Sequence, residues 1–351
     1  MTRVGAVDCG TNSIRLLIAD DDGRGGLTEI RRDMVIVRLG QGVDATGRLA
    51  PEAVERTRAA LADYVESMGE HGVERVRMVA TSATRDASNR DEFFAMTADL
   101  LGRVVPGAVA EVISGDEEAR LSFRGAVGDL ISTPLDQRGV PLDRRGASLD
   151  RRGASLDRRE TLDRGETSRW SSEVETTFLV TDLGGGSTEL VTSEAAFSAD
   201  IGCVRLTEHA LHSDPPTAAE IAAAEAFVAE RLAPAFAAVP VERARTWVGV
   251  AGTLTTLAAL HLGLTEYDSA RIHLSRIPLA DLERVCRDLI AMPCAQRAEL
   301  GPMHPGRVDV IGGGALVTLA LAAEFARRAG IDELVVSETD ILDGIALGLL
   351  D

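Results

Sequence analysis

Two short segments of the chain carry the same arrangement of an aspartate, glycines and hydroxyl side chains. The first reads Asp8-Cys9-Gly10-Thr11-Asn12-Ser13 and the second reads Asp182-Leu183-Gly184-Gly185-Gly186-Ser187. Because glycine lets the backbone amides approach an anion closely, each turn is suited to holding a phosphate group. Two such turns that face each other across a cleft would hold adjacent phosphates of a chain. The repeated motif therefore indicates phosphoryl chemistry in a protein of two lobes.

Both turns lie between β-like runs, which distinguishes them from other phosphate-binding loops. Apolar runs at 4–7 and 177–181 precede them, and runs at 14–18 and 188–191 follow them. A P-loop needs a lysine and then a helix, whereas all 37 basic residues of this chain are arginine. A dinucleotide-binding loop also opens a helix. We therefore predict strand, turn and strand twice, with two ordinary hairpins as the alternative.

Glu118 is the candidate general base. Ser114 and Glu117 have the spacing of a capping box, which predicts that the Glu117 side chain folds back on the helix N-terminus. Glu118 is turned by about 100° around the same helix and is not needed for the cap. Phosphoryl transfer to water needs a group that orients and deprotonates that water. The alternative is an exposed acid in the first helical turn.

Arg85 is the candidate phosphate clamp. It follows a predicted strand and a Thr-Ser-Ala-Thr turn. The planar guanidinium group matches the geometry of phosphate oxygens. The alternative is a surface salt bridge.

Helical and strand patterns alternate along the chain, which indicates an α/β layer fold. We expect helices over 51–68, 89–101, 217–238, 279–290, 315–328 and 340–350, and strands over 76–80, 109–113, 247–251 and 334–337. The glycine run 312–314 is expected to precede the helix over 315–328.

Residues 134–167 repeat a Leu-Asp-Arg-Arg-Gly pattern with one strongly apolar position in each unit. Such units cannot bury a core, so we interpret them as a solvated, disordered insertion that arose by tandem expansion. The alternative is an arginine-rich arm that captures polyanions. The expected domains are a first lobe over 1–128, the insertion over 129–175, a second lobe over 176–330, and a segment over 331–351 that returns to the first lobe.

Composition limits the classes of partner. The 351 residues are 45% hydrophobic but only 3% aromatic, and their net charge of −18 argues against nucleic-acid and anionic-membrane binding. A polyanionic substrate then needs arginines in the cleft or a divalent cation. The four cysteines lack a Cys-x-x-Cys pair, and no apolar run is long enough for a membrane helix. These features predict a cytoplasmic protein.

The chain resembles the exopolyphosphatase/guanosine-pentaphosphate phosphohydrolase family, within the actin-like ATPase and sugar-kinase superfamily. The resemblance spans the whole chain apart from the repeats, in family order. It rests on these segments: Val7 to Ser13, Ala80 to Arg85, Ile113 to Leu121, Asp182 to Leu190 and Ala251 to Thr253. The combination of Ser-Gly-x-Glu-Glu-Ala-Arg with Asp-x-Gly-Gly-Gly-Ser-Thr-Glu is highly specific.

The resemblance implies two ribonuclease-H-like lobes with the active site in the cleft between them, and a homodimer. It implies that Glu118 is the catalytic base, with Arg85 on a phosphate-binding position. Further residues fall on phosphate-binding positions: Gly10, Thr11, Asn12, Ser13, Gly184, Gly185, Gly186, Ser187 and Thr188. Asp8, Asp182 and Glu189 fall on acidic positions near a divalent cation, Mg²⁺ or another.

Two departures from the family pattern matter. The closing segment usually carries Arg-Glu-Gly, but here it reads Leu342-Asp343-Gly344. Longer members continue into a C-terminal helical domain, whereas this sequence ends at Asp351, which favours short polyphosphates.

We therefore expect a hydrolase that releases terminal phosphate from inorganic polyphosphate. Guanosine pentaphosphate and nucleoside di- or triphosphates share the same anhydride and remain open as substrates. One alternative function is a sugar- or acetate-kinase-like transferase on the same fold, but the sequence contains no motif that indicates a sugar-binding site. The other is a non-catalytic sensor of polyphosphate or guanosine pentaphosphate.

Overall fold

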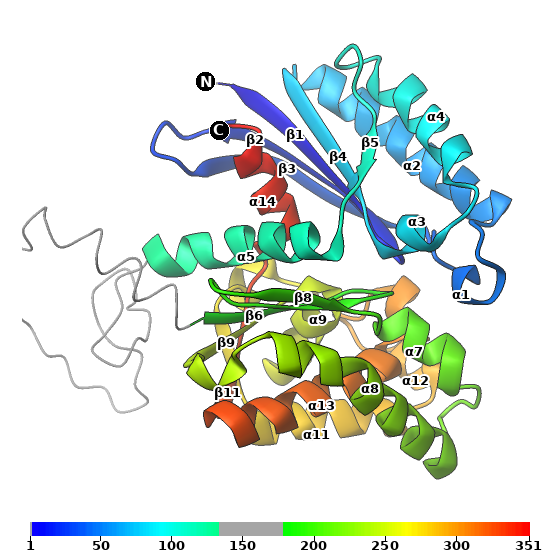
Figure 1. Ribbon diagram of the computed structural model, residues 1–351, viewed down its shortest axis with the longest axis vertical. Helices are drawn as coiled ribbons and strands as arrows, with labels where there is room; N and C mark the ends of the chain where they lie inside the picture. The colour runs from blue at the N-terminus through cyan, green and yellow to red at the C-terminus, as the bar shows by residue number, and fades with distance from the viewer. Residues whose placement is uncertain (1, 133–177) are drawn as a thin grey trace, which may run out of the picture.

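The computed structural model describes residues 2–132 and 178–351, which form two α/β lobes stacked on one another (Figure 1). The strands of the first lobe are β1 (Arg3–Cys9), β2 (Ser13–Asp21), β3 (Leu27–Ile36), β4 (Arg75–Ala80) and β5 (Ala110–Val112). The strands of the second lobe are β6 (Phe178–Leu183), β7 (Thr188–Val191), β8 (Ala196–Ala199), β9 (Thr246–Val250), β10 (Ser275–Pro278) and β11 (Glu333–Val336).

The two sheets have the same topology at their centres. The first has the order β3-β2-β1-β4-β5 and the second has the order β10-β11-β9-β6-β7-β8. In each, an antiparallel meander (β1-β2-β3 or β6-β7-β8) continues through its first strand into parallel strands. This repeat confirms the predicted pair of ribonuclease-H-like lobes.

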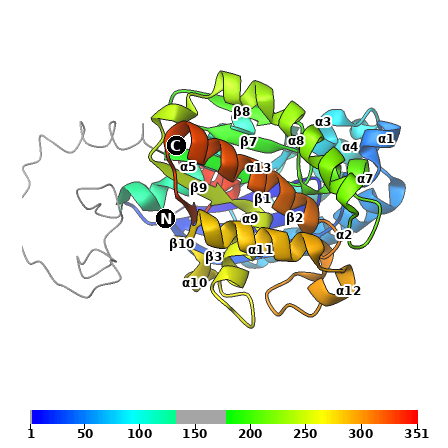
Figure 2. The same ribbon diagram turned by 90° about the horizontal axis from the view of Figure 1, so that it is seen from below.

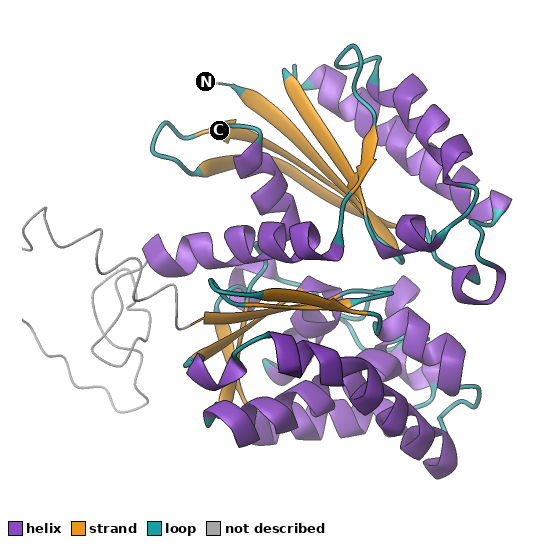
Figure 3. Ribbon diagram, in the orientation of Figure 1, coloured by secondary structure: helices purple, strands orange, loops and turns teal. Residues whose placement is uncertain are grey.

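Helices cover the outer face of each sheet (Figure 3). The first lobe contains α1 (Val43–Thr46), α2 (Pro51–Glu70), α3 (Ser82–Asp86) and α4 (Arg90–Leu101). The helix α2 begins with a proline, whose missing amide needs no partner there, and it buries Leu61, Tyr64 and Met68. These side chains pack against Val7, Leu16 and other residues of the sheet.

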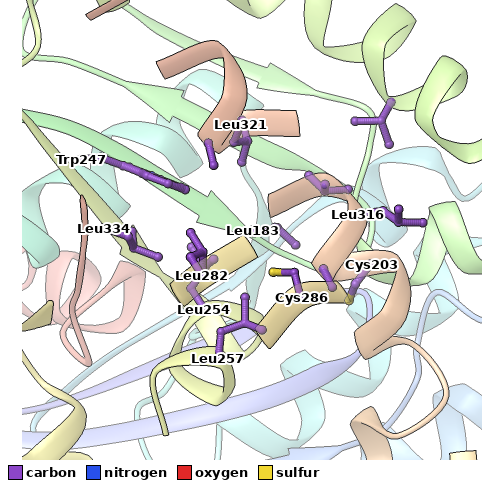
Figure 4. Packing of buried hydrophobic residues seen from close by; sticks show 14 of the residues in the cluster. Leu183, Cys203, Trp247, Leu254, Leu257, Leu282, Cys286, Leu316, Leu321 and Leu334 are labelled. Carbon is purple, nitrogen blue, oxygen red and sulfur yellow. The ribbon is translucent and has the colours of Figure 1, made fainter. Parts of the chain in front are cut away.

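The second lobe is held by a larger core, in which Trp247 is fully buried. Its main helices are α7 (Cys203–Ala210), α8 (Ala218–Ala238), α9 (Ala251–His261), α11 (Leu279–Ala291) and α13 (Ile311–Ala329). The shorter ones are α10 (Ser269–Ile272) and α12 (Cys294–Arg297). Figure 2 shows α8, α11 and α13 on the outside of this lobe, and Figure 4 shows leucines from several elements around Trp247. The indole N–H donates to Thr181 Oγ1 at 2.8 Å, which satisfies its only polar atom.

The glycine run at 312–314 differs from its expected role as a break before a helix. It lies inside the first turns of α13, which begins at Ile311. A Cβ at position 313 would lie 2.7 Å from the carbonyl oxygen of Cys203, and one at position 314 would lie 2.6 Å from Thr253 Cγ2. The glycines therefore allow α13 to approach α7 and α9 closely. Tertiary packing here outweighs the low helical propensity of glycine.

Two helices cross between the lobes, α5 (Gly115–Ser132) and α14 (Ile341–Gly348) (Figure 1). The helix α5 leaves the first lobe but packs Ala126 and Leu130 against Val180 and other valines of the second sheet. The helix α14 leaves the second sheet after β11 and packs Ile345 against the first sheet. Each helix therefore packs against the sheet of the lobe that it enters.

The crossing of α5 and α14 depends on two glycines. A Cβ at Gly125 would overlap the carbonyl oxygen of Asp340, and a Cβ at Gly344 would overlap the carbonyl oxygen of Leu121. The contact matters for the site because Glu118 lies in the first turn of α5.

The insertion expected over 129–175 lies largely outside the described residues, and residues 129–132 end α5. Within the two described ranges, no helix combines the length and apolar character needed to cross a membrane.

Gly125→Ala is expected to lower the free energy of unfolding by about 2 kcal/mol or more, because the added methyl group forces α5 away from α14. Gly128→Ala is the matched control on the same helix, since a Cβ there meets no atom of the described residues within 4 Å. The control should raise the free energy of unfolding by about 0.5–1 kcal/mol. Urea unfolding of the three proteins measures both effects, and equal stability of the two variants would contradict this packing.

Candidate active site

The two glycine turns have the same hydrogen-bonded geometry. The Gly10 amide donates to the Ser13 carbonyl at 2.9 Å, and the Gly184 amide donates to the Ser187 carbonyl at 3.1 Å. The first turn joins β1 to β2, and the second joins β6 to β7. Each aspartate at the turn entrance therefore lies at the end of a central strand of its sheet. The sequence repeat corresponds to a repeat of one hairpin.

The two turns meet across the lobes. A Cβ at Gly185 would lie 3.1 Å from Thr11 Cβ, and a Cβ at Gly186 would lie 2.7 Å from Thr11 Oγ1. Thr11 Oγ1 is also hydrogen-bonded to Ser82 Oγ at 2.9 Å. Glycine at both positions permits this close approach, because a Cβ at Gly186 would overlap the hydroxyl groups of Ser82 and Thr11 and one at Gly185 would press on Thr11.

A cavity lies where the turns converge. Most of the predicted site residues line it: Asp8, Gly10, Thr11, Asn12, Ser13, Glu118, Asp182, Gly184, Gly185, Gly186 and Ser187. Arg85, Thr188 and Glu189 are not among its lining residues. The structure thus brings both turns and the proposed base to one cavity and leaves three predicted residues behind its wall.

Glu118 lines this cavity with only 7% of its surface exposed. Its Oε2 accepts a hydrogen bond from Arg85 Nη1 at 2.7 Å. Burial raises the pKa of Glu118 to about 7, and the positive charge of Arg85 opposes part of that rise. A carboxylate with such a pKa is matched to proton transfer near neutral pH.

The capping box expected at the start of α5 forms only in part. The Glu117 amide donates to Ser114 Oγ at 3.2 Å. The Glu117 side chain accepts from Arg77 Nη2 at 2.6 Å, so it does not take the expected position over the helix end. A long-range ion pair replaces the local contact, and the sequence spacing could not reveal it.

Arg85 contacts the base from behind the cavity. Besides Glu118, its Nη1 donates to the Ile113 carbonyl at 3.1 Å. These contacts link α3, which carries Arg85, to the residues just before and within α5. In this structure Arg85 therefore orients Glu118, and its guanidinium group is not exposed on the cavity wall.

Thr188 and Glu189 are buried beneath the second turn. Thr188 Oγ1 donates to the Ile201 carbonyl at 2.5 Å, which fixes the strand that follows the turn. Glu189 is 1% exposed and its Oε1 accepts from Ser198 Oγ at 2.6 Å. Burial and the nearby carboxylates of Glu118 and Asp182 raise the pKa of Glu189.

Arg15 is a site residue that the motif analysis missed. It lies directly opposite Asp8 in the β1–β2 register, and its Nη2 contacts Asp8 Oδ2 at 2.6 Å. Its Nη1 pairs with Asp340, which comes from the segment before α14. The predicted hairpin could have identified Arg15, because the register of the two strands places Arg15 opposite Asp8. No motif near Asp340 in the sequence identified it as a site residue.

Asp182 is buried on the second-lobe side of the cavity. Its Oδ2 accepts from Ser122 Oγ at 2.6 Å, which connects it to α5. Burial and the charge of Asp340 raise the pKa of Asp182 to about 6. Several carboxylates therefore surround one cavity, with Arg15 and Arg85 as their main counter-charges.

Arg307 is a second missed residue, and it lines the cavity from a short 3-10 helix (Pro305–Arg307) before α13. Its Nη1 donates to Thr256 Oγ1 at 3.3 Å, and it forms no ion pair with the residues of 2–132 and 178–351. Beside it, Ala251 adopts a left-handed backbone with φ of 73° at the start of α9. Such a conformation is costly for alanine and is typical of functional sites.

The acidic groups fit a divalent cation that the substrate helps to hold. Asp8 and Asp182 both line the cavity, and Asp8 Oδ1 is buried without a hydrogen-bond partner among the described residues. In the described part of the chain, no three acidic, histidine or cysteine side chains are arranged to hold a metal by themselves. Mg²⁺ is usually bound by one or two carboxylates together with substrate phosphates, and the chemistry of Asp8 and Asp182 fits that kind of site.

Comparisons with known proteins agree with this geometry. The model of the Ppx/GppA phosphatase family matches residues 17–152 and 168–348. The chain is 58% identical over 356 aligned positions to a Mycobacterium tuberculosis protein named Exopolyphosphatase 2, with 99% of each chain covered. The crystal structure of an exopolyphosphatase-like protein is similar with a TM-score of 0.81 at 39% identity, covering 99% of this chain and 97% of that one. The Aquifex aeolicus member of the Ppx/GppA family is similar with a TM-score of 0.71 at 28% identity, covering 99% of this chain and 97% of that one. The chain belongs to the Ppx/GppA phosphatase family.

Proposed function

We propose that this protein is an exopolyphosphatase, a hydrolase that releases the terminal phosphate of short inorganic polyphosphate chains. The observation that carries the proposal is the position of Glu118, a buried acid of α5, in the cavity formed by both glycine turns. The similarity to Exopolyphosphatase 2 over the whole chain supports the same activity. Guanosine pentaphosphate contains the same type of anhydride and is the alternative substrate within this family.

In the proposed mechanism the two turns bind adjacent phosphates, and Glu118 takes a proton from the attacking water. Arg85 holds the Glu118 carboxylate at 2.7 Å, so the base keeps one orientation as it accepts the proton. Asp8 and Asp182 would hold Mg²⁺, which when bound offsets negative charge on the phosphates. Arg307, which has no ion-pair partner among the described residues, adds positive charge at the cavity wall. We also expect the protein to act as a homodimer in the cytoplasm.

Phosphate release from polyphosphate, guanosine pentaphosphate and nucleoside triphosphates, each with and without Mg²⁺, tests the proposal. We expect release from polyphosphate that requires the divalent cation. Tight binding of all these anions without any phosphate release would instead identify a sensor. Transfer of phosphate to an added alcohol or carboxylate, without release to water, would identify a transferase.

Glu118→Gln should keep substrate binding and lower turnover by about 10²–10⁴, because the amide cannot accept the proton from water. Glu117→Gln is the matched control, since Glu117 lies next along α5 and pairs with Arg77 outside the cavity. Steady-state phosphate release and polyphosphate binding measure the two effects. Near-normal turnover of Glu118→Gln would contradict the role of Glu118.

The pH profile should show the raised pKa of Glu118. Because the base must be deprotonated, kcat/KM should fall as the pH drops below about 7, well above the ordinary glutamate value of 4.5. Arg85→Met removes the charge that lowers this pKa, so the acidic limb should move to higher pH. Arg103→Met changes an exposed arginine elsewhere and should leave the limb in place. A limb near pH 4.5, or a shift to lower pH in Arg85→Met, would contradict this account.

A further inference from the structure

The short helix α3 carries Arg85 and contacts the second lobe at both of its ends. It spans Ser82–Asp86, and no side chain caps its N-terminus. Isolated helices shorter than about 12–15 residues are marginal in water, so the orientation of α3 depends on its tertiary contacts. The direction in which Arg85 presents its guanidinium group to Glu118 therefore depends on what holds the two ends of α3.

The N-terminal end of α3 touches the second glycine turn. A Cβ at Gly186 would lie 2.3 Å from Ser82 Oγ, which is also hydrogen-bonded to Thr11 Oγ1 at 2.9 Å. Ser82 is buried by these contacts. This end of the helix thus lies where the two lobes meet.

The C-terminal end of α3 pairs with Arg205 of α7. Arg205 Nη2 donates to Asp86 Oδ2 at 2.6 Å, and Asp86 directly follows Arg85 in the chain. The same guanidinium group lies 2.9 Å from Asp44 Oδ2 of α1 and 3.4 Å from Asp200 Oδ1. Figure 1 shows α1 and α3 at the end of the first lobe nearest α7. The Arg205 side chain is 13% exposed, whereas those of Asp44 and Asp86 are 42% and 41% exposed.

Arg205 is also joined to the second glycine turn through its backbone. The amides of Val204 and Arg205 donate to the Gly185 carbonyl at 2.9 and 3.1 Å. The Cys203 amide donates to the Gly184 carbonyl at 3.1 Å. The first turn of α7 therefore fixes the carbonyl groups of the glycine turn. One residue thus contacts that turn through its amide and contacts α3 through its side chain.

Three carboxylates share the guanidinium group of Arg205. Asp44 and Asp86 belong to the first lobe, and Asp200 follows β8 in the second lobe. Without the arginine, these like charges would repel one another across the boundary between the lobes. Exposed ion pairs usually contribute little to stability, but several charges around one largely buried arginine hold a defined geometry. We therefore expect this network to affect the position of α3 more than the free energy of unfolding.

We propose that Arg205 is a positioning residue that couples the second glycine turn to the orientation of the base Glu118. The inference rests on the proposed hydrolase function. The path runs from the turn to Arg205, through its ion pair to Asp86, and along α3 to Arg85, which holds the base at 2.7 Å. A phosphate group bound in the turn then meets a base that is already oriented, and such positioning lowers the barrier to reaction.

Asp86→Asn tests this path, with Asp44→Asn as its matched control. Both aspartates pair with Arg205 across the lobes and are exposed to nearly the same extent, but Asp44 belongs to α1. Asp86→Asn should lower kcat for tripolyphosphate by about three- to tenfold with little change in KM, because the base is misplaced while both turns are kept. Asp44→Asn should keep kcat within about twofold of the unmodified protein. Equal kcat values of the two variants would overturn the inference.

A double-mutant cycle separates a path through Arg85 from a general loosening of the lobes. Arg205→Met should lower kcat by about tenfold in the unmodified protein but by less than about twofold in the Arg85→Met background, where α3 no longer orients the base. Arg231→Met removes an exposed arginine from the same surface hollow and should leave kcat unchanged in both backgrounds. Additive losses from the substitutions of Arg205 and Arg85 would contradict the proposed path.

Hydrogen exchange supplies a readout that does not depend on turnover. The Thr84 and Arg85 amides donate to the Thr81 carbonyl at 3.1 and 3.0 Å. Their exchange should be faster in Asp86→Asn than in Asp44→Asn, because the C-terminal end of α3 is released. Unchanged exchange together with unchanged kcat would contradict this inference alone. Faster exchange in a protein that releases no phosphate would contradict the proposed function while supporting the coupling of α3 to the second lobe.

Discussion

The direct contact between the two glycine turns is the constraint on which the rest of the site depends. Gly185 and Gly186 approach the first lobe so closely that a side chain at either position would force Thr11 or Ser82 to shift. The two hairpins must therefore end at the same place, and the aspartates at their entrances come within reach of a common ligand. The crossing of α5 and α14 through Gly125 and Gly344 maintains this approach and delivers Glu118 to the same cavity.

A second consequence of this convergence is electrostatic. Closing the lobes buries Asp8, Glu118 and Asp182 around one cavity, with Asp340 buried beside Arg15, in a chain whose net charge is already −18. Burying unpaired charges is costly, so each carboxylate needs a hydrogen bond, a counter-charge or a proton. Arg15 and Arg85 supply part of that compensation, and raised pKa values of Glu118 and Asp182 supply another part. This concentration of carboxylates supports the proposal that a divalent cation binds together with the polyanion.

The sequence predicted those parts of the site that lie within single segments. The repeated Asp-x-Gly pattern predicted both hairpins, and most of the helices and strands expected from periodicity are present. What it could not predict depends on contacts between distant segments. The pairing of Glu117 with Arg77, the placement of Arg85 behind Glu118, and the arrival of Arg307 and Asp340 in the cleft all depend on tertiary structure. The helical glycines at 312–314 illustrate the same point, because only close packing of α13 explains them.

The most direct measurement is a crystal structure of the Glu118→Gln protein with tripolyphosphate and Mg²⁺. The account predicts that adjacent phosphates contact the turn at 10–13 and the turn at 184–187, with the side chain at position 118 directed at the terminal phosphorus. Binding of the phosphates to one turn only, or a side chain at position 118 directed away from the bound anion, would contradict it.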